Sequence, residues 1–135
     1  MTPRSVAEQF VAAIDAHDVE RLASLMTSDH RFIDSLGVVV EGRDAVREGW
    51  KFYFAMVPDY KLDISRCFVA DAGATEVVLV GVASGSYQSK GIRRPNSSWS
   101  TPAALRAVVR NNQIAEWQVY ADNVRHAHGM RDVDS

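Results

Sequence analysis

The chain has 135 residues, of which 47% are apolar, and its formal net charge at neutral pH is −2. This composition predicts one domain spanning residues 1–135 with a real hydrophobic core, and it excludes a disordered chain. The nearly balanced charge gives no footprint for a nucleic-acid partner. A single cysteine, Cys67, excludes an internal disulfide and a multi-cysteine metal site.

Signals for targeting, metal binding and cofactor binding are missing from the sequence. Residues 1–5 lack the apolar run of a secretion signal, and no apolar stretch approaches a membrane span, so we expect a cytoplasmic protein without membrane contact. His126 and His128 have no obvious third ligand, so no metal is expected. No phosphate-binding loop or nucleophile elbow occurs, and no cofactor is expected.

Three helices are predicted in the first part of the chain. The first begins at Thr2-Pro3, which offers a cap and a first-turn proline, or at the alternative capping box Ser5-x-x-Glu8. Asp18 caps a short second helix. Gly42 begins a third helix. This helix should end near Val57, because the residue before Pro58 disfavours helical conformation.

The second part of the chain has the period of strands. Alternation begins at Tyr60, and residues 77–83 are continuously apolar, which predicts a strand covered on both faces. Strands at 99–109 and 114–123 meet at a tight turn formed by Asn111-Asn112. The predicted fold is α+β: a curved, mostly antiparallel sheet, shaped as a half-barrel cone, with the three N-terminal helices on its concave face.

A short strand carries the first candidate site residue. Counting in twos, His30, Phe32 and Asp34 share one face. A carboxylate among apolar neighbours is costly to bury in its ionised form, which raises its pKa and suits it to general acid–base chemistry. The alternative is an aspartate at a strand end that caps a turn at Ser35 and Gly37.

The last hairpin predicts a second unusual residue. A two-residue turn at Asn111-Asn112 places Arg106 opposite Trp117 and Ala104 opposite Val119 on an apolar, concave face. Small residues on that face leave space for a ligand. Because the Arg106 guanidinium is charged and lies on an apolar face, it needs a carboxylate, an aromatic face or a ligand anion as partner. The alternative is that its side chain extends to the solvent at the sheet edge.

The ligand-binding residues are expected from the apolar and aromatic positions that would face this cavity. Each aromatic residue alone is also an ordinary core residue. The expected wall consists of Phe10, Phe32, Trp50, Tyr53, Trp99, Ala104, Trp117 and Val119.

The order of these elements resembles the nuclear transport factor two-like superfamily. The segments that carry the resemblance are Ala16–Met26, Phe32–Asp34, Gly42–Val46 and the final strand Ile114–Asp122. This superfamily holds the ketosteroid isomerases, SnoaL-like polyketide cyclases, limonene epoxide hydrolases and scytalone dehydratases. The resemblance implies a conical pocket and a homodimer.

The functional residues of these families match this chain only in part. Asp34 falls where ketosteroid isomerases have their proton-shuttling aspartate. Their oxyanion-hole tyrosine and protonated aspartate fall at about Phe10 and Ala104, so both donors are missing. The catalytic aspartate of limonene epoxide hydrolases falls at Val119, and that of SnoaL-type cyclases falls close to Asp122.

The sequence therefore predicts a cofactor-independent acid–base enzyme of isomerase, cyclase or lyase type, acting on a small, largely apolar molecule. Asp34 would move the proton, Arg106 would stabilise negative charge, and His30 or Tyr53 would be a further donor. Two alternatives stay open. One is a non-catalytic binding protein in which Asp34 and Arg106 form an internal ion pair. The other is a dimeric interaction module that uses the outer sheet face.

Overall fold

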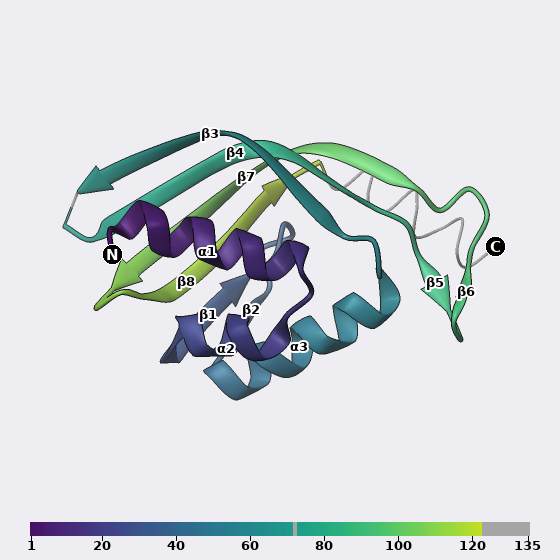
Figure 1. The fold of residues 1–135 in the computed structure, drawn as a ribbon, viewed down its shortest axis with the longest axis horizontal. Coiled ribbons are helices and arrows are strands. Elements are labelled where there is room, and N and C mark those ends of the chain that lie inside the picture. The colour runs from purple at the N-terminus through teal and green to yellow at the C-terminus, as the bar shows by residue number, and fades with distance from the viewer. Residues whose placement is uncertain (72, 123–135) are drawn as a thin grey trace.

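The computed structural model describes residues 1–71 and 73–122, which form three helices and eight strands. A long curved sheet arches over the helices, which lie on its concave side (Figure 1). In chain order the elements are α1 (Pro3–Asp15), α2 (Val19–Leu25), β1 (Met26–Ile33), β2 (Val39–Glu41), α3 (Arg43–Met56), β3 (Lys61–Asp71), β4 (Thr75–Gly85), β5 (Gln88–Ser89), β6 (Ile92–Arg93), β7 (Trp99–Arg110) and β8 (Gln113–Ala121).

The helices begin and end where the capping residues predict. Of the two possible starts for α1, the one at Thr2 is used: its hydroxyl accepts from the Ser5 N–H at 3.1 Å, and the Thr2 N–H donates to the Ser5 hydroxyl at 2.9 Å. The Asp18 carboxylate accepts from the Arg21 N–H at 3.0 Å and starts α2. Helix α3 ends at Met56, two residues before Pro58.

The main sheet has six strands in the order β2-β1-β8-β7-β4-β3. All neighbouring pairs are antiparallel except β1 and β8, which are parallel. The predicted α+β fold, with a curved and mostly antiparallel sheet over three helices, is confirmed. Helix α1 supplies the centre of the core through Phe10 and Ile14, which are fully buried, as is Trp117 of β8.

The β7–β8 hairpin has the predicted turn but not the predicted register. Asn111 and Asn112 have φ angles of 52° and 61°, the left-handed values that a primed two-residue turn requires. Beyond the turn, however, a bulge shifts the pairing, so that Arg106 lies opposite Gln118 rather than Trp117. An added residue in one strand moves every later side chain to the other face. The predicted pairing of Arg106 with Trp117 is therefore wrong.

No described residue of the chain covers the outer face of the sheet. In the apolar run of β4, Val77 and Leu79 are buried toward the helices, whereas Val82 on the outer face is 41% exposed. Within residues 1–71 and 73–122, the prediction that this strand is covered on both faces is wrong, because Val82 is exposed on the outer face. Apolar residues on this face are available for contact with another molecule.

Candidate functional site

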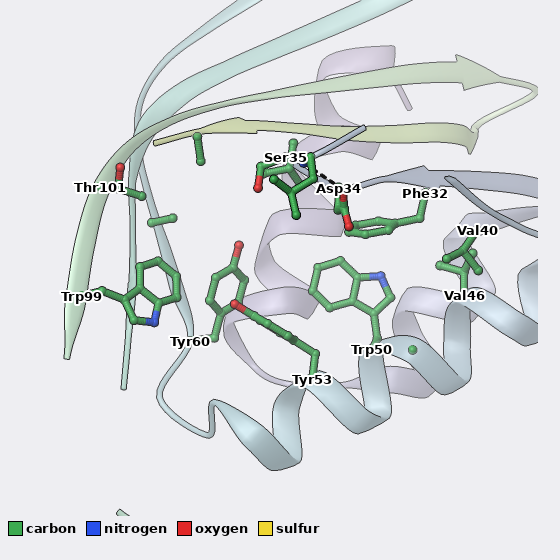
Figure 2. A pocket seen from close by; sticks show the side chains of 15 residues that line it. Phe32, Asp34, Ser35, Val40, Val46, Trp50, Tyr53, Tyr60, Trp99 and Thr101 are labelled. Atoms are coloured by element: carbon green, nitrogen blue, oxygen red, sulfur yellow. Dashed lines mark hydrogen bonds between the residues drawn. The ribbon is translucent and has the colours of Figure 1, made fainter. Parts of the chain in front are cut away.

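A cavity of about 350 Å³ lies between α3, the turn after β1 and the inner face of the sheet (Figure 2). This volume is within the range of pockets for small organic molecules. Its lining residues are Phe32, Asp34, Ser35, Leu36, Val40, Val46, Gly49, Trp50, Tyr53, Tyr60, Ala83, Trp99, Thr101, Val119 and Ala121.

Helix α3 contributes one stripe of side chains to the cavity. Val46, Gly49, Trp50 and Tyr53 follow the spacing i, i+3, i+4 and i+7, which places them on one face of a helix. Gly49 has no side chain, and apart from its chain neighbours and the backbone of its own helix no atom lies within 4 Å of the place where a Cβ would be. The helix therefore leaves open space beside Trp50.

Five aromatic side chains form one side of the cavity, which we call the aromatic wall: Phe32, Trp50, Tyr53, Tyr60 and Trp99. The ring centroids of Phe32 and Trp50 lie 5.6 Å apart, those of Tyr53 and Tyr60 5.1 Å, and those of Tyr60 and Trp99 6.0 Å. These are favourable edge-to-face or tilted contacts. Each ring is thus fixed by its neighbours before a ligand enters.

Asp34 follows the end of β1 and is held by its own turn. Its Oδ1 atom accepts hydrogen bonds from the N–H groups of Leu36 and Val38, both at 2.9 Å, and Gly37 adopts φ 85° within the turn. No hydrogen bond to Oδ2 is found among the described residues. Asp34 therefore caps a turn, as one of the two interpretations from the sequence expected, and its side chain also lines the cavity.

Two tyrosine hydroxyl groups reach the cavity from the aromatic wall. Figure 2 shows the hydroxyl of Tyr60 pointing from the wall toward Ser35. Burial raises the pKa of Tyr53 and that of Tyr60 above the usual value for tyrosine, so both stay protonated at neutral pH. A protonated tyrosine hydroxyl is a neutral group that can donate a hydrogen bond.

Sequence reasoning did not find Tyr60, Ser35 or Thr101 as lining residues. For Tyr60 a signal existed, because its alternation with Leu62 placed both on the inner face of a strand. Nothing in the sequence showed that the inner face opens into a cavity at Tyr60 and is closed at Leu62, which is 3% exposed.

Six of the predicted site residues do meet around the cavity: Phe32, Asp34, Trp50, Tyr53, Trp99 and Val119. Three predicted wall residues do not line it. Phe10 and Trp117 are fully buried and pack on one another with centroids 4.6 Å apart, and they belong to the core beneath α1. Ala104 lies on the outer face opposite Tyr120, because of the bulge in the hairpin.

His30 is a core residue rather than part of the cavity lining. Its Nδ1 lies 2.7 Å from the carbonyl oxygen of Ile114, so Nδ1 carries the proton and donates to it. Its Nε2 has no hydrogen-bond partner among the described residues. Burial lowers the pKa of His30, so the imidazole is neutral at neutral pH.

Arg106 also lies away from the cavity, on the outer face of the sheet. Its Nε donates to the Glu76 carboxylate at 3.1 Å, and its guanidinium also pairs with Glu116. These carboxylates raise its pKa. The predicted partnership between Arg106 and Asp34, whether catalytic or as an internal ion pair, is therefore wrong, because the bulge reverses the face on which Arg106 lies.

Metal and membrane features were also sought in the described part of the chain. Within residues 1–71 and 73–122, no group of three or more histidine, cysteine, aspartate or glutamate side chains has an arrangement that could hold a metal ion. His126 and His128 lie outside the described residues. No described helix is both long enough and apolar enough to cross a membrane.

The sequence model of the SnoaL-like domain matches residues 7–117. The chain belongs to this SnoaL-like family. The match covers α1 through most of β8, including all lining residues except Val119 and Ala121. A search of curated proteins found no match to this SnoaL-like chain.

Solved structures share the fold of this SnoaL-like protein at low sequence identity. A protein from Shewanella denitrificans assigned as a SnoaL-like polyketide cyclase has TM-score 0.78 at 16% identity, over 96% of this chain and 98% of that one. A ketosteroid isomerase-like fold protein from Catenulispora acidiphila, in complex with trimethylamine, has TM-score 0.72 at 23% identity, over 89% and 86%. An epoxide hydrolase of the limonene type from M. tuberculosis has TM-score 0.74 at 14% identity, over 97% and 86%.

Proposed function

We propose that this SnoaL-like protein is a cofactor-independent acid–base enzyme, of isomerase, cyclase or lyase type, that acts on a small and largely apolar molecule. The observation that carries the proposal is the placement of Asp34. Its carboxylate lines an otherwise mostly apolar cavity, and two backbone N–H groups hold one of its oxygens at 2.9 Å. A fixed carboxylate beside bound substrate is suited to proton transfer.

The proposed reaction begins with proton removal from a carbon next to a carbonyl group. The C–H bond breaks, the proton passes to Oδ2 of Asp34, and the electron pair moves onto the carbonyl oxygen to form an enolate. The hydroxyl groups of Tyr53 and Tyr60 are the nearest counterparts of an oxyanion hole in this cavity, and both are neutral donors. Return of the proton to another carbon completes an isomerisation, and loss of a leaving group completes an elimination.

The substitution Asp34→Asn tests the proposal directly. The asparagine Oδ1 can still accept from Leu36 and Val38, so the turn is kept while the base is lost. Proton abstraction is measurable without the natural substrate, as loss of the α-proton NMR signals of small cyclic ketones in D2O. We expect exchange by the wild-type protein and a decrease of about 100-fold or more in the variant.

Asp63→Asn is the matched control, because Asp63 is exposed on β3 and lies away from the cavity. It should exchange like the wild type. Equal exchange by the Asp34→Asn variant and the wild-type protein would show that Asp34 is not the base.

The alternative function is binding of a small hydrophobic ligand without catalysis. It is favoured by the cavity lining, in which the described residues provide no second carboxyl group beside Asp34 that could serve as a protonated donor. Ligand binding in the absence of any Asp34-dependent exchange would support it. In either case we expect the protein to act in the cytoplasm, without a nucleic-acid partner, and as a homodimer.

A further inference from the structure

We propose that the ligand of this cavity is a small organic cation: an amine, protonated or quaternary, on an otherwise apolar body. The inference rests on the proposed function only in taking the cavity as the ligand site, and it adds the charge of the ligand. It is carried by the juxtaposition of one carboxylate with a wall of aromatic rings.

The charge of the cavity is the first argument. Among the 15 described residues that line it, Asp34 is the only one of a charged residue type, and none is lysine, arginine or histidine. The Asp34 carboxylate accepts from two backbone N–H groups at 2.9 Å, and no ion pair to it is found among the described residues. The carboxylate therefore gives the cavity a negative potential, which disfavours an anionic ligand and favours a cationic one.

The aromatic wall is the second argument. The faces of tryptophan and tyrosine rings attract cations through their quadrupoles, most strongly where water is excluded. Trp50, Tyr60 and Trp99 are each less than 8% exposed, so the attraction is weakly screened. Figure 2 shows Asp34 across the cavity from these rings, so a cation between them interacts favourably with both sides.

A cationic substrate also fits the proposed chemistry. With its ammonium group between the aromatic wall and Asp34, the adjacent carbon of the ligand lies beside the carboxylate that removes its proton. A positive charge close to the carbon that loses its proton stabilises the negative charge that develops there.

An isosteric pair of ligands tests the inference. The 3-hydroxyphenyltrimethylammonium ion and 3-tert-butylphenol have nearly the same shape and differ in replacing N⁺ by carbon. Isothermal titration of the full chain with each ligand compares their affinities. Because water solvates the cation far better than the neutral isostere, tighter binding of the cation requires attraction within the cavity. We expect the cation to bind at least about tenfold more tightly.

Variants identify the source of the preference. Asp34→Asn should weaken binding of the cation about tenfold and leave the neutral isostere unchanged. Tyr60→Leu should weaken the cation more than the isostere, whereas Tyr60→Phe, which keeps the ring, should retain the preference. Phe52→Leu is the control, because Phe52 is 72% exposed on α3 and does not line the cavity.

Each remaining outcome has one consequence. Equal or tighter binding of the neutral isostere overturns the inference but leaves the proposed enzyme intact, because that proposal depends on Asp34-dependent exchange. Failure of both ligands to bind overturns the inference as well. If the Asp34→Asn and Tyr60→Leu variants both still prefer the cation over the neutral isostere, the cation binds elsewhere. That result also overturns the inference.

Discussion

Asp34 shows how a single residue can be structural and chemically available at once. One oxygen closes the turn through two backbone hydrogen bonds, and this fixes the carboxylate relative to the aromatic wall. Because backbone N–H groups orient the carboxylate, an asparagine at this position can accept the same two hydrogen bonds. The structural role of Asp34 and its proposed role in proton transfer are therefore separable by experiment.

Gly81 provides a prediction about sheet curvature. A Cβ at this position would lie 1.9 Å from the backbone oxygen of Asp63, next to the bulge where β3 bends. Gly81→Ala should therefore lower the free energy of unfolding by about 2 kcal/mol or more, measured by urea denaturation. Gly49→Ala, with nothing within 4 Å, should instead raise it by about 0.5–1 kcal/mol. Equal effects of the two substitutions would contradict this account.

His30 provides a prediction about pH. Burial lowers its pKa in the folded protein below the usual 6.5, so below pH 6.5 the unfolded chain binds more protons than the folded one. Neutral His30 therefore contributes to the free energy of unfolding in full above pH 6.5. This contribution is lost as the pH falls toward the pKa of His30 in the folded protein, and the free energy of unfolding changes by at most about 1.4 kcal/mol per pH unit. His30→Asn keeps a donor toward Ile114 but cannot titrate. The difference in unfolding free energy between pH 7.5 and 5.5 should be smaller for that variant; an unchanged difference would exclude His30 as its source.

At the scale of elements, one bulge determines which face of the sheet the side chains of the β7–β8 hairpin lie on. It moves Arg106 from the expected concave face to the outer face, into a line of alternating charges that crosses five neighbouring strands. The line runs Glu41, Arg31, Glu116, Arg106 and Glu76, and neighbouring members form ion pairs. It joins strands on the face opposite the cavity, so its effect on the site is indirect.

Arg106→Gln should therefore affect stability and not binding. Loss of the pairs with Glu76 and Glu116 should lower the free energy of unfolding by about 1 kcal/mol, because the side chain is only partly exposed and joins two carboxylates. Urea denaturation in low and high salt measures this loss, which should shrink in high salt. Affinity for cavity ligands should stay at the wild-type value. A large loss of affinity would contradict the placement of Arg106.

At the scale of the whole molecule, the cavity and the outer sheet face lie on opposite sides of one sheet. The outer face exposes Phe68, Val82 and Tyr120 by 51%, 41% and 49%. Together with the implied homodimer, this predicts that two copies associate through this face. Each copy would then keep its cavity separate from the interface.

Val82→Lys should shift the protein toward the monomer in sedimentation experiments, because it places a charge in the apolar part of the interface. Phe52→Lys changes an exposed aromatic residue on α3, on the other side of the molecule, and should leave the association unchanged. A monomeric wild-type protein at micromolar concentration would exclude the dimer.

How well each feature could be predicted depended on how far apart in the sequence its interacting residues lie. Caps at Thr2 and Asp18 and the turn at Asn111-Asn112 are local, and each was predicted correctly from neighbouring residues. The short strand β2 was missed, because its three residues pair with β1 and have no pattern of their own. Asp34 was identified as a candidate site residue because a carboxylate is unusual on an apolar strand face.

By itself, the sequence determined the order of elements, the α+β fold and most of the aromatic wall, since hydrophobic period and capping are properties of residues close together in the chain. The tertiary structure alone decided the face of Arg106, the burial of His30 and the joining of Tyr60 to the site. Those depend on strand register and on space left between distant elements, and a single extra residue in β8 is enough to change the face on which Arg106 lies.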